Sequence, residues 1–151
     1  MTKGKLFGST NLEEALLSIK FGADELGIHF HGKSPRYISP KAARQIVDEL
    51  PQKVLKIGVF VNESLDVILE TAKVADLDAI QLHGDEENRF IEEVHMMSGL
   101  PVIKALKIST EFEPKTARVG SAQAILRDSY STTDYVGRGE PVEWNRAKSA
   151  Q

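Results

Sequence analysis

The sequence predicts an α/β fold made of six strand–helix units. Apolar segments of strand length alternate strictly with segments of amphipathic helical spacing, which indicates parallel strands joined by right-handed crossovers. The segment Leu55 to Asn62 is rich in β-branched residues and apolar on both faces, as in a strand that is covered on both sides. Periodicity leaves an open sheet and a barrel as alternatives. A Rossmann-type sheet is disfavoured, because no glycine-rich phosphate fingerprint follows the first strand.

Composition narrows the class of protein. The chain has 151 residues, 41% of them hydrophobic, which predicts a single domain over residues 1–151. A net charge of -3 and a pI near 5.8 give no basic field for nucleic acid. No apolar run approaches the ~20 residues of a membrane span, and the N-terminus lacks the order of a signal peptide, so we expect a cytoplasmic protein. The absence of cysteine excludes disulfides and thiolate chemistry, and the four histidines form no metal-ligand spacing.

Each predicted element has a local sequence signal. Glycine, proline and capping residues mark the ends, and apolar spacing marks the buried faces. The predicted strands are a first one at Lys5 to Phe7, then Leu26 to His31, Leu55 to Asn62, Ile80 to His83, Pro101 to Ile108 and Ala124 to Ser129. The predicted helices are Leu12 to Gly22, Ser39 to Leu50, Ser64 to Ala75 and Asp85 to Met97, with a short, weak one around Lys115 to Val119.

The segment Gln81-Leu82-His83-Gly84-Asp85-Glu86 is the strongest candidate for a site. Alternation along the strand puts Gln81 and His83 on one face, opposite the apolar pair. His83 then stands at the carboxyl end of a parallel strand, where ligands bind in such folds. Asp85 and Glu86 are expected in the first turn of the following helix, where the helix dipole favours negative charge. A satisfied polar residue at a strand end is the alternative for His83.

Two arginines also stand out, one in a loop and one within a strand. Arg36 lies in the loop Gly32 to Tyr37, where a guanidinium can clamp a carboxylate or phosphate, although a solvated loop arginine is the commoner case. Arg127 lies on the face of strand six that a full barrel would turn toward its helices, where an unpaired charge is costly. If strand six is an edge, Arg127 reaches water and discourages aggregation; a snorkelling side chain is the alternative.

Four motifs in order resemble those of phosphoribosylanthranilate isomerase, an enzyme family of tryptophan biosynthesis. They are Ser34-Pro35-Arg36-Tyr37, Gly58-Val59-Phe60-Val61-Asn62, the segment from Gln81 to Glu86, and Val102-Ile103-Lys104-Ala105. The resemblance spans nearly the whole chain and implies a (β/α)8, TIM-type barrel. Family members continue for roughly two further units, so the resemblance implies an incomplete barrel here, about six of eight units.

The resemblance also implies a reaction and the residues for it. The reaction is an Amadori rearrangement of N-(5'-phosphoribosyl)anthranilate that needs no cofactor, with one group as general acid and another as general base. Asp128 matches the acid, and alternation places it on the face of Leu126, from which it can point inward. Arg36 matches the arginine that holds the anthranilate carboxylate, and His83 matches the site histidine. The implied partner is a small phosphorylated substrate.

The sequence departs from the family at the position of the catalytic general base. The family reads Lys-Ile-Cys-Gly in its first strand, whereas this chain reads Lys5-Leu6-Phe7-Gly8, so Phe7 occupies the cysteine position. A phenyl ring cannot accept a proton, and on the inward face it would fill space needed by substrate. The Gly-Gly-Thr-Gly run of the family appears as Val136-Gly137-Arg138-Gly139. The loops that hold the substrate phosphate in the family belong to the two further units.

Three hypotheses follow for function. The first is an isomerase in which another group, His29 or His31 near the end of strand two, replaces the base. The second is a binding or regulatory protein that has lost turnover, and the third is a degenerate copy that only folds. Phe7 and the missing phosphate loops favour the second and third and predict loss of turnover. Unpaired edges on strands one and six also predict a dimer or larger homo-oligomer.

Overall fold

The computed structural model describes residues 4–108 and 122–129. In these residues six strands and four helices alternate in the predicted order. The strands are β1 (Gly4–Phe7), β2 (Ala23–His29), β3 (Leu55–Phe60), β4 (Ala79–Leu82), β5 (Val102–Ile108) and β6 (Ala124–Ser129). The helices are α1 (Leu12–Lys20), α2 (Pro40–Asp48), α3 (Leu65–Ala75) and α4 (Asn88–Ser98).

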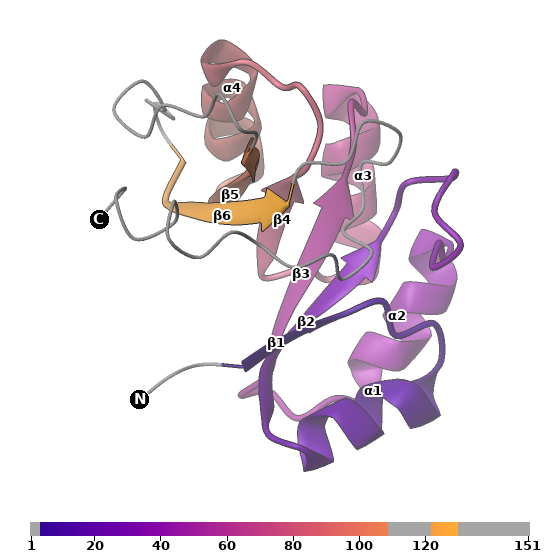
Figure 1. Ribbon diagram of the computed structural model, residues 1–151. Helices are drawn as coiled ribbons and strands as arrows, with labels where there is room; N and C mark the ends of the chain where they lie inside the picture. Colours follow the sequence, from indigo (N-terminus) through magenta and orange to yellow (C-terminus); the bar gives the residue numbers. More distant parts are fainter. Residues whose placement is uncertain (1–3, 109–121, 130–151) are drawn as a thin grey trace.

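The strands form one parallel sheet in the order β1-β2-β3-β4-β5-β6. Each strand pairs with the next one in the sequence, as in a (β/α) barrel, whereas a doubly wound sheet reverses its order part-way. The sheet curls, and the helices follow one another around its outer side (Figure 1). The prediction of an incomplete TIM-type barrel with strands ordered one to six is confirmed.

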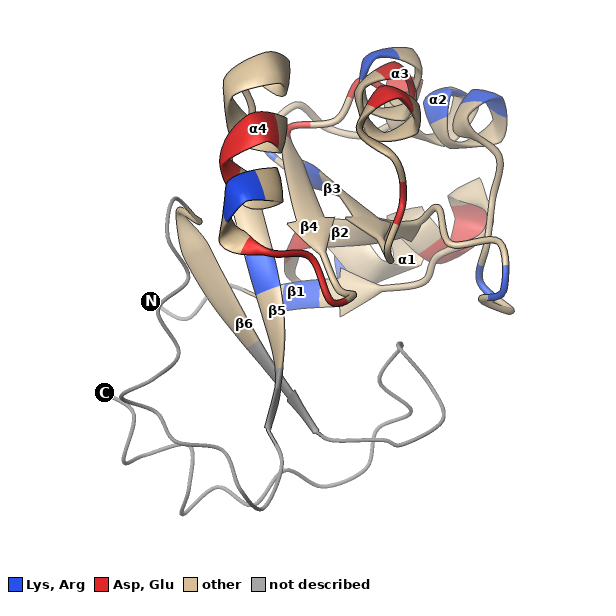
Figure 2. Ribbon diagram, turned by 90° about the horizontal axis from the view of Figure 1, so that it is seen from above, with Lys and Arg blue, Asp and Glu red and all other residues tan. Residues whose placement is uncertain are grey.

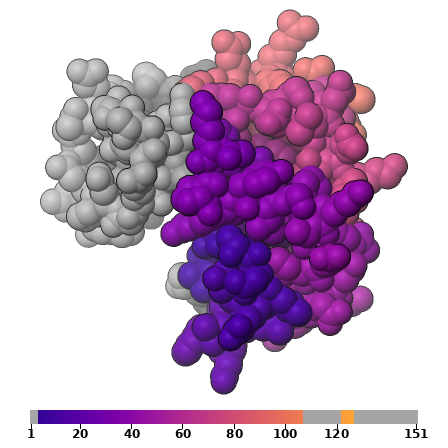
Figure 3. Space-filling view, turned by 90° about the vertical axis from the view of Figure 1, so that its right-hand side faces the viewer, coloured from indigo at the N-terminus to yellow at the C-terminus, as the bar shows by residue number. Residues whose placement is uncertain are grey.

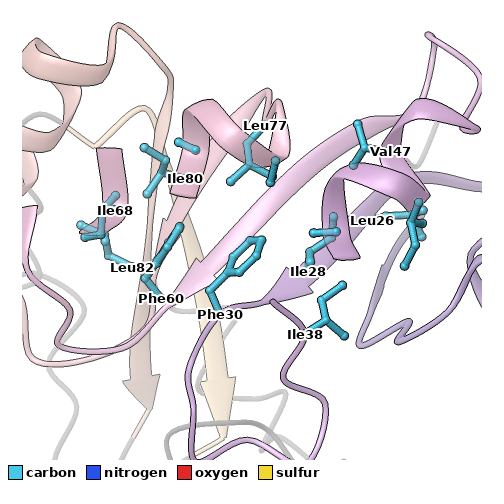
Figure 4. Close-up of a cluster of buried hydrophobic side chains, with 14 of the residues drawn as sticks. Leu26, Ile28, Phe30, Ile38, Val47, Phe60, Ile68, Leu77, Ile80 and Leu82 are labelled. Carbon is cyan, nitrogen blue, oxygen red and sulfur yellow. The ribbon is translucent and has the colours of Figure 1, made fainter. Parts of the chain in front are cut away.

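The hydrophobic core lies between the sheet and the helices. Figure 4 shows Phe30 and Phe60 at its centre, and their rings stack with centroids 5.3 Å apart. Strand residues of one face, among them Leu26, Ile28, Ile80 and Leu82, pack there against helix residues such as Val47 and Ile68. Figure 3 shows the molecule from the side of α2, where the residues of the first two strand–helix units, coloured indigo to violet, lie next to one another on the surface.

The inner face of the sheet carries a different set of side chains. Ile57, Val59 and Ala79 are buried but lie outside the core cluster under the helices. The inner positions nearer the carboxyl ends of the strands include buried polar residues, notably Gln81 and His83. Alternation therefore separates a dry outer layer from an inner layer in which polar groups gather.

Capping residues place the first helices as predicted. The Asn11 side chain accepts a hydrogen bond from the Glu14 backbone N–H at 2.9 Å, and Ser39 Oγ accepts one from the Ala42 N–H. Pro40 stands in the first turn of α2. Gly22, at a φ of 93°, turns the chain out of α1. Local chemistry thus fixes where these units begin and end.

The predicted start of α4 is wrong. The helix begins at Asn88 with Glu87 as its N-cap residue, so Asp85 and Glu86 belong to the preceding loop. Glu86 is held there by hydrogen bonds and an ion pair to other elements, which keep it from joining a helical turn. The strands β2 and β3 each end two residues before the predicted position. The predicted helix around Lys115 to Val119 and the segment from Tyr130 onward lie outside the described residues.

Within the part of the chain that the structure describes, no helix combines the length and apolar character needed to cross a membrane.

Candidate functional site

The carboxyl ends of the strands bring residues of four elements to one end of the sheet. Phe7 ends β1, His29 ends β2, and His83 follows β4 directly. Arg36 reaches the same place from the loop between β2 and α2: its side chain lies against Gly8, the residue after Phe7, and its charge acts on His29. His83 acts on His29 as well. The structure therefore brings together four positions that the sequence singles out, at the end where barrel folds bind ligands.

A chain of hydrogen bonds connects β1 to His83. Lys5 Nζ donates to Gln81 Oε1 at 2.6 Å, and Gln81 Nε2 lies 3.0 Å from His83 Nδ1. An ammonium group can only donate, so Gln81 turns its oxygen to Lys5 and its NH2 group to His83. His83 Nδ1 is then the acceptor, and the ring proton lies on Nε2. Lys5 thus fixes the tautomer of His83 through Gln81.

Burial lowers the pKa of Lys5 to about 8, while the Glu25 carboxylate opposes that shift. The ammonium lies 4.8 Å from the centroid of the Phe7 ring, which gives the charge a cation–π contact in place of water. Near neutral pH the amine keeps its proton, because its pKa remains above 7. Lys5 is therefore a donor in this site, and it is a site residue that the sequence analysis missed.

Phe7 occupies the inner face at the end of β1. It pairs with Gly27 in β2, and a Cβ atom at Gly27 would collide with the Phe7 ring. The ring therefore lies across β2 over the glycine. Its edge faces His29, with the ring centroids 6.2 Å apart and the planes at 67°. The phenyl group at this position forms one wall of the site, and His29 lies next to it.

His29 is buried without a partner. Its side chain is 2% exposed, and within the described residues neither Nδ1 nor Nε2 has a hydrogen-bond partner. Burial, and then the charges of Arg36, His83 and His31, lower its pKa to about 4. The imidazole is neutral at neutral pH and keeps a lone pair. Buried polar atoms are nearly always hydrogen-bonded, so this ring needs an explanation.

Arg36 leans over the turn that follows β1. A Cβ atom at Gly8 would collide with the Arg36 side chain, and Gly8 has a φ of 85°, which favours glycine. The Arg36 backbone N–H donates to Ser34 Oγ within its own loop. The arginine is exposed to solvent, as a residue that receives a ligand must be. Gly8 therefore makes the room in which the Arg36 side chain lies.

The loops after β3 and β4 are bound to each other. Asn62 Oδ1 accepts from the Asp85 backbone N–H at 2.7 Å, and the Asn62 side chain fills the space beside Gly84 that a Cβ atom would need. The Glu86 carboxylate accepts from the backbone N–H groups of Asn62 and Gly84, both at 2.9 Å. Acidic residues line this loop in Figure 2. The loop that carries His83 is therefore fixed on both sides.

Lys104 completes this arrangement from β5. Its ammonium donates to Glu86 Oε2 and to the Gly84 carbonyl oxygen, both at 2.6 Å. The side chains of Lys104 and Glu86 are only 6% and 4% exposed. A buried ion pair persists only when further hydrogen bonds satisfy it, and here the backbone supplies them. The pair joins β5 to the loop behind His83.

For the other site residues predicted from the sequence, the structure gives less detail. Asp128 lies in β6 and pairs with Lys107, and Arg127 pairs with Leu106. The side chains of Asp128 and Arg127 lie outside what the structure describes, so their predicted directions stay predictions. His31 lies two residues after β2, half-buried, and its charge acts on His29.

Comparison with known proteins fits this geometry. The family model of N-(5'phosphoribosyl)anthranilate (PRA) isomerase matches residues 5–151. The N-(5'-phosphoribosyl)anthranilate isomerase of Thermotoga neapolitana is 43% identical over 145 residues, which cover 96% of this chain and 69% of that protein. The chain belongs to this family. The resemblance read from its four motifs is confirmed.

Solved structures of phosphoribosylanthranilate isomerases superpose on the chain. The enzyme of Thermus thermophilus matches with a TM-score of 0.88 and 35% identity, over 99% of this chain and 71% of that one. A second isomerase was solved in complex with reduced 1-(o-carboxyphenylamino)-1-deoxyribulose 5-phosphate. It matches with a TM-score of 0.78 and 42% identity, over 87% of this chain and 66% of that one. The family and the barrel arrangement are therefore established for this chain.

Proposed function

We propose that the chain catalyses the isomerisation of N-(5'-phosphoribosyl)anthranilate, the reaction for which its relatives are named. One observation carries the proposal. In a chain of this family, Arg36 and His83 converge from separate loops on a buried imidazole at the carboxyl ends of the strands. A cation, an imidazole and an unpartnered nitrogen in one place suit a substrate that carries a carboxylate and must lose a proton.

The residues take separate roles in the proposal. Arg36, exposed at the rim, pairs with the anthranilate carboxylate, since a guanidinium binds a carboxylate in bidentate fashion. His83, held by Gln81, lies beside the substrate at the loop that Glu86 and Lys104 fix. Asp128 in β6 is the general acid that protonates the ribose ring oxygen. The reaction then needs a base at C2.

A direct assay tests the proposal. Purified chain is mixed with N-(5'-phosphoribosyl)anthranilate, and the loss of anthranilate fluorescence is followed against a sample without protein. Arg36→Ala is expected to weaken binding of the reduced deoxyribulose phosphate analogue, and Asp128→Asn to lower kcat by ~10²- to 10⁴-fold with the binding kept. Lys41→Ala, on the first turn of α2, is the control that should change neither. A fluorescence decay equal to the protein-free rate would reject the activity.

A binding protein without turnover is the second candidate, and Phe7 is the observation that favours it. The phenyl ring stands where the family has its thiol, and it offers neither proton nor lone pair. Such a protein would bind the analogue through Arg36 and His83 and leave the substrate unchanged. Binding measured by calorimetry together with a null fluorescence assay would select this candidate.

We also infer that the chain assembles with copies of itself. Within the described residues β1 pairs only with β2, and β6 only with β5. Both outer strands carry an exposed large apolar residue, Leu6 on β1 at 44% and Ile125 on β6 at 48%. Free strand edges with apolar side chains favour association.

A further inference from the structure

Resting on the isomerase function proposed above, we propose that His29 is the general base that removes the C2 proton of the substrate. Position 7, where the family has a thiol, holds a phenyl ring. The side chain beside that ring is His29, at the last position of β2.

The first argument is the state of the imidazole. His29 is 2% exposed, and neither of its nitrogens has a hydrogen-bond partner in the described part of the chain. A protein core rarely keeps a polar ring in this condition, because burial removes water and supplies nothing in return. A lone pair that is needed for proton transfer gives the ring a reason to stay unpaired.

The second argument is position. The Phe7 ring lies over Gly27 and meets His29 edge to face. His29 stands two residues beyond Gly27, the partner of Phe7, and therefore on the same face of β2 and nearer its carboxyl end. Arg36, the proposed carboxylate partner, is close enough for its charge to act on His29. A substrate held at Arg36 comes to lie over this ring.

The third argument is that the neighbouring groups cannot serve. Lys5 keeps its proton and donates to Gln81. His83 has its Nδ1 lone pair occupied by the Gln81 amide. Within the described residues, the charged or titratable groups around His29 are Arg36 and His31 from the loop after β2, His83 from the loop after β4, and Lys5 beyond Phe7. Val59, the β3 residue paired with His29, is apolar. The ring nitrogens that are both buried and without a hydrogen-bond partner are those of His29, whereas His31 is half-buried and lies two residues further along the loop.

Burial and nearby charges set the pKa of His29. Burial and the nearby cation hold the pKa of His29 at about 4, so the free protein presents a neutral ring. The anionic groups of a bound substrate offset the Arg36 charge and raise the pKa of His29 toward its ordinary value. The ring therefore becomes a stronger base when the substrate is in place.

The proposed step conserves atoms and electrons. After the ring has opened, C1 and the anthranilate nitrogen form a protonated imine. A lone pair of His29 takes the C2 proton, the electrons of the C2–H bond form the C1–C2 double bond, and the imine electrons move to nitrogen. The enol formed at C2 then gives its hydroxyl proton to the Asp128 carboxylate, which protonated the ring oxygen in the first step, while C1 gains a proton from the imidazolium. His29 ends as it began, and the net change is an isomerisation.

The experiment uses the full chain and two readouts: kcat from the fluorescence assay and Kd for reduced 1-(o-carboxyphenylamino)-1-deoxyribulose 5-phosphate. His29→Gln is expected to lower kcat by ~10²- to 10⁴-fold and leave Kd unchanged. His31→Gln is the matched control from the same loop end. The double variant Phe7→Cys/His29→Gln is expected to regain turnover, because the thiol returns a base to the site.

The pH profile separates a base from a structural role. Between pH 5 and 7, above the pKa of His29 and below that of Lys5, kcat/KM of the unmodified chain should vary little, because the base is already deprotonated and Lys5 keeps its proton. The double variant should instead lose activity as pH falls below the ordinary thiol pKa of about 8.5. Three outcomes would overturn the assignment of His29 as the base and leave the proposed activity standing. They are turnover that survives His29→Gln, a loss of analogue binding in His29→Gln that matches its loss of kcat, and a greater kcat loss in His31→Gln. An unmodified chain that binds the analogue without turnover would overturn both this assignment and the proposed activity.

Discussion

At the scale of single residues, the inner face of the sheet holds ionisable groups whose burial disfavours their charged forms. Lys5 and His29 flank Phe7, one through a cation–π contact and the other edge to face. Both have lowered pKa values for the same main reason, the loss of water around the charge. Perturbed groups of this kind gather at functional sites more often than elsewhere.

Stability should fall in acid because of His29. The unfolded chain binds a proton at this residue below pH 6.5, while the folded chain resists protonation until about pH 4, so acid favours unfolding within that window. We expect the free energy of unfolding to decrease between pH 7 and pH 4 by as much as roughly 3 kcal/mol more in the unmodified chain than in His29→Gln. Urea titrations at several pH values measure this. Equal pH dependence of both proteins would contradict the low pKa.

Lys5 should react as an amine near pH 8. With a pKa of about 8, about half of its side chain is deprotonated there, whereas an ordinary lysine with a pKa near 10.4 is almost fully protonated. Acetylation at increasing pH, followed by peptide mass mapping, should give a midpoint near 8 for Lys5. A short lysine peptide with the ordinary pKa near 10.4 is the control and should reach its midpoint more than a unit higher. A common midpoint for Lys5 and the peptide would refute the shift.

At the scale of elements, the turns after the strands position the site. Gly8→Ala should weaken binding of the product analogue, because the new methyl group displaces Arg36. It should also cost about 1 to 3 kcal/mol of stability through the positive φ. Gly22→Ala is the matched control, since Gly22 has a φ of 93° and open space around it. Chemical denaturation and calorimetry distinguish the two effects. Similar affinity in both variants would show that Arg36 does not depend on Gly8.

The loop after β4 depends on Glu86. Glu86→Ala leaves the buried Lys104 ammonium without its counter-ion and removes acceptors from two backbone N–H groups. We expect a loss of about 3 to 5 kcal/mol in unfolding free energy. Glu87→Ala, at the neighbouring exposed N-cap position without a side-chain hydrogen bond, should cost about 1 kcal/mol or less. Denaturant unfolding measures both, and equal losses would contradict a structural role for the ion pair.

Local signals predicted most elements, and long-range contacts explain the failures. Glycine, proline and cap residues marked the helices correctly because their effects act within a turn. The start of α4 was misjudged because Glu86 is drawn away by Lys104, 18 residues further along the chain. Acidic residues after a strand resemble a helix start, and nothing local reveals the cation opposite them.

For the candidate site too, local signals were predictive and long-range contacts were not. Alternation correctly placed Gln81 and His83 on one face, and a hydrogen bond now joins their side chains. Lys5 was missed because its contact with Gln81 spans 76 residues and exists only when the sheet curls. The strand order also could not come from periodicity, since an open sheet and a barrel share the same alternation of strands and helices. The family resemblance supplied that choice.

At the scale of the whole molecule, the curled sheet of the described residues ends in two outer strands, β1 and β6. In the described residues β1 and β6 each pair on one side only, and Leu6 and Ile125 are exposed there. Unpaired strands expose backbone donors and acceptors together with apolar side chains, and a second copy can satisfy both through a symmetric interface.

We therefore expect a dimer or larger assembly at micromolar concentration that dissociates on dilution. Light scattering or sedimentation over a dilution series measures the mass directly. Leu6→Lys and Ile125→Lys should shift the chain toward monomer, because a charge on an edge strand opposes pairing. Met96→Lys is the control, since Met96 is 80% exposed on a helix, α4, rather than on an outer strand. A compact monomer that unfolds cooperatively at every concentration, and that responds equally to all three substitutions, would show that the outer strands do not serve as interfaces.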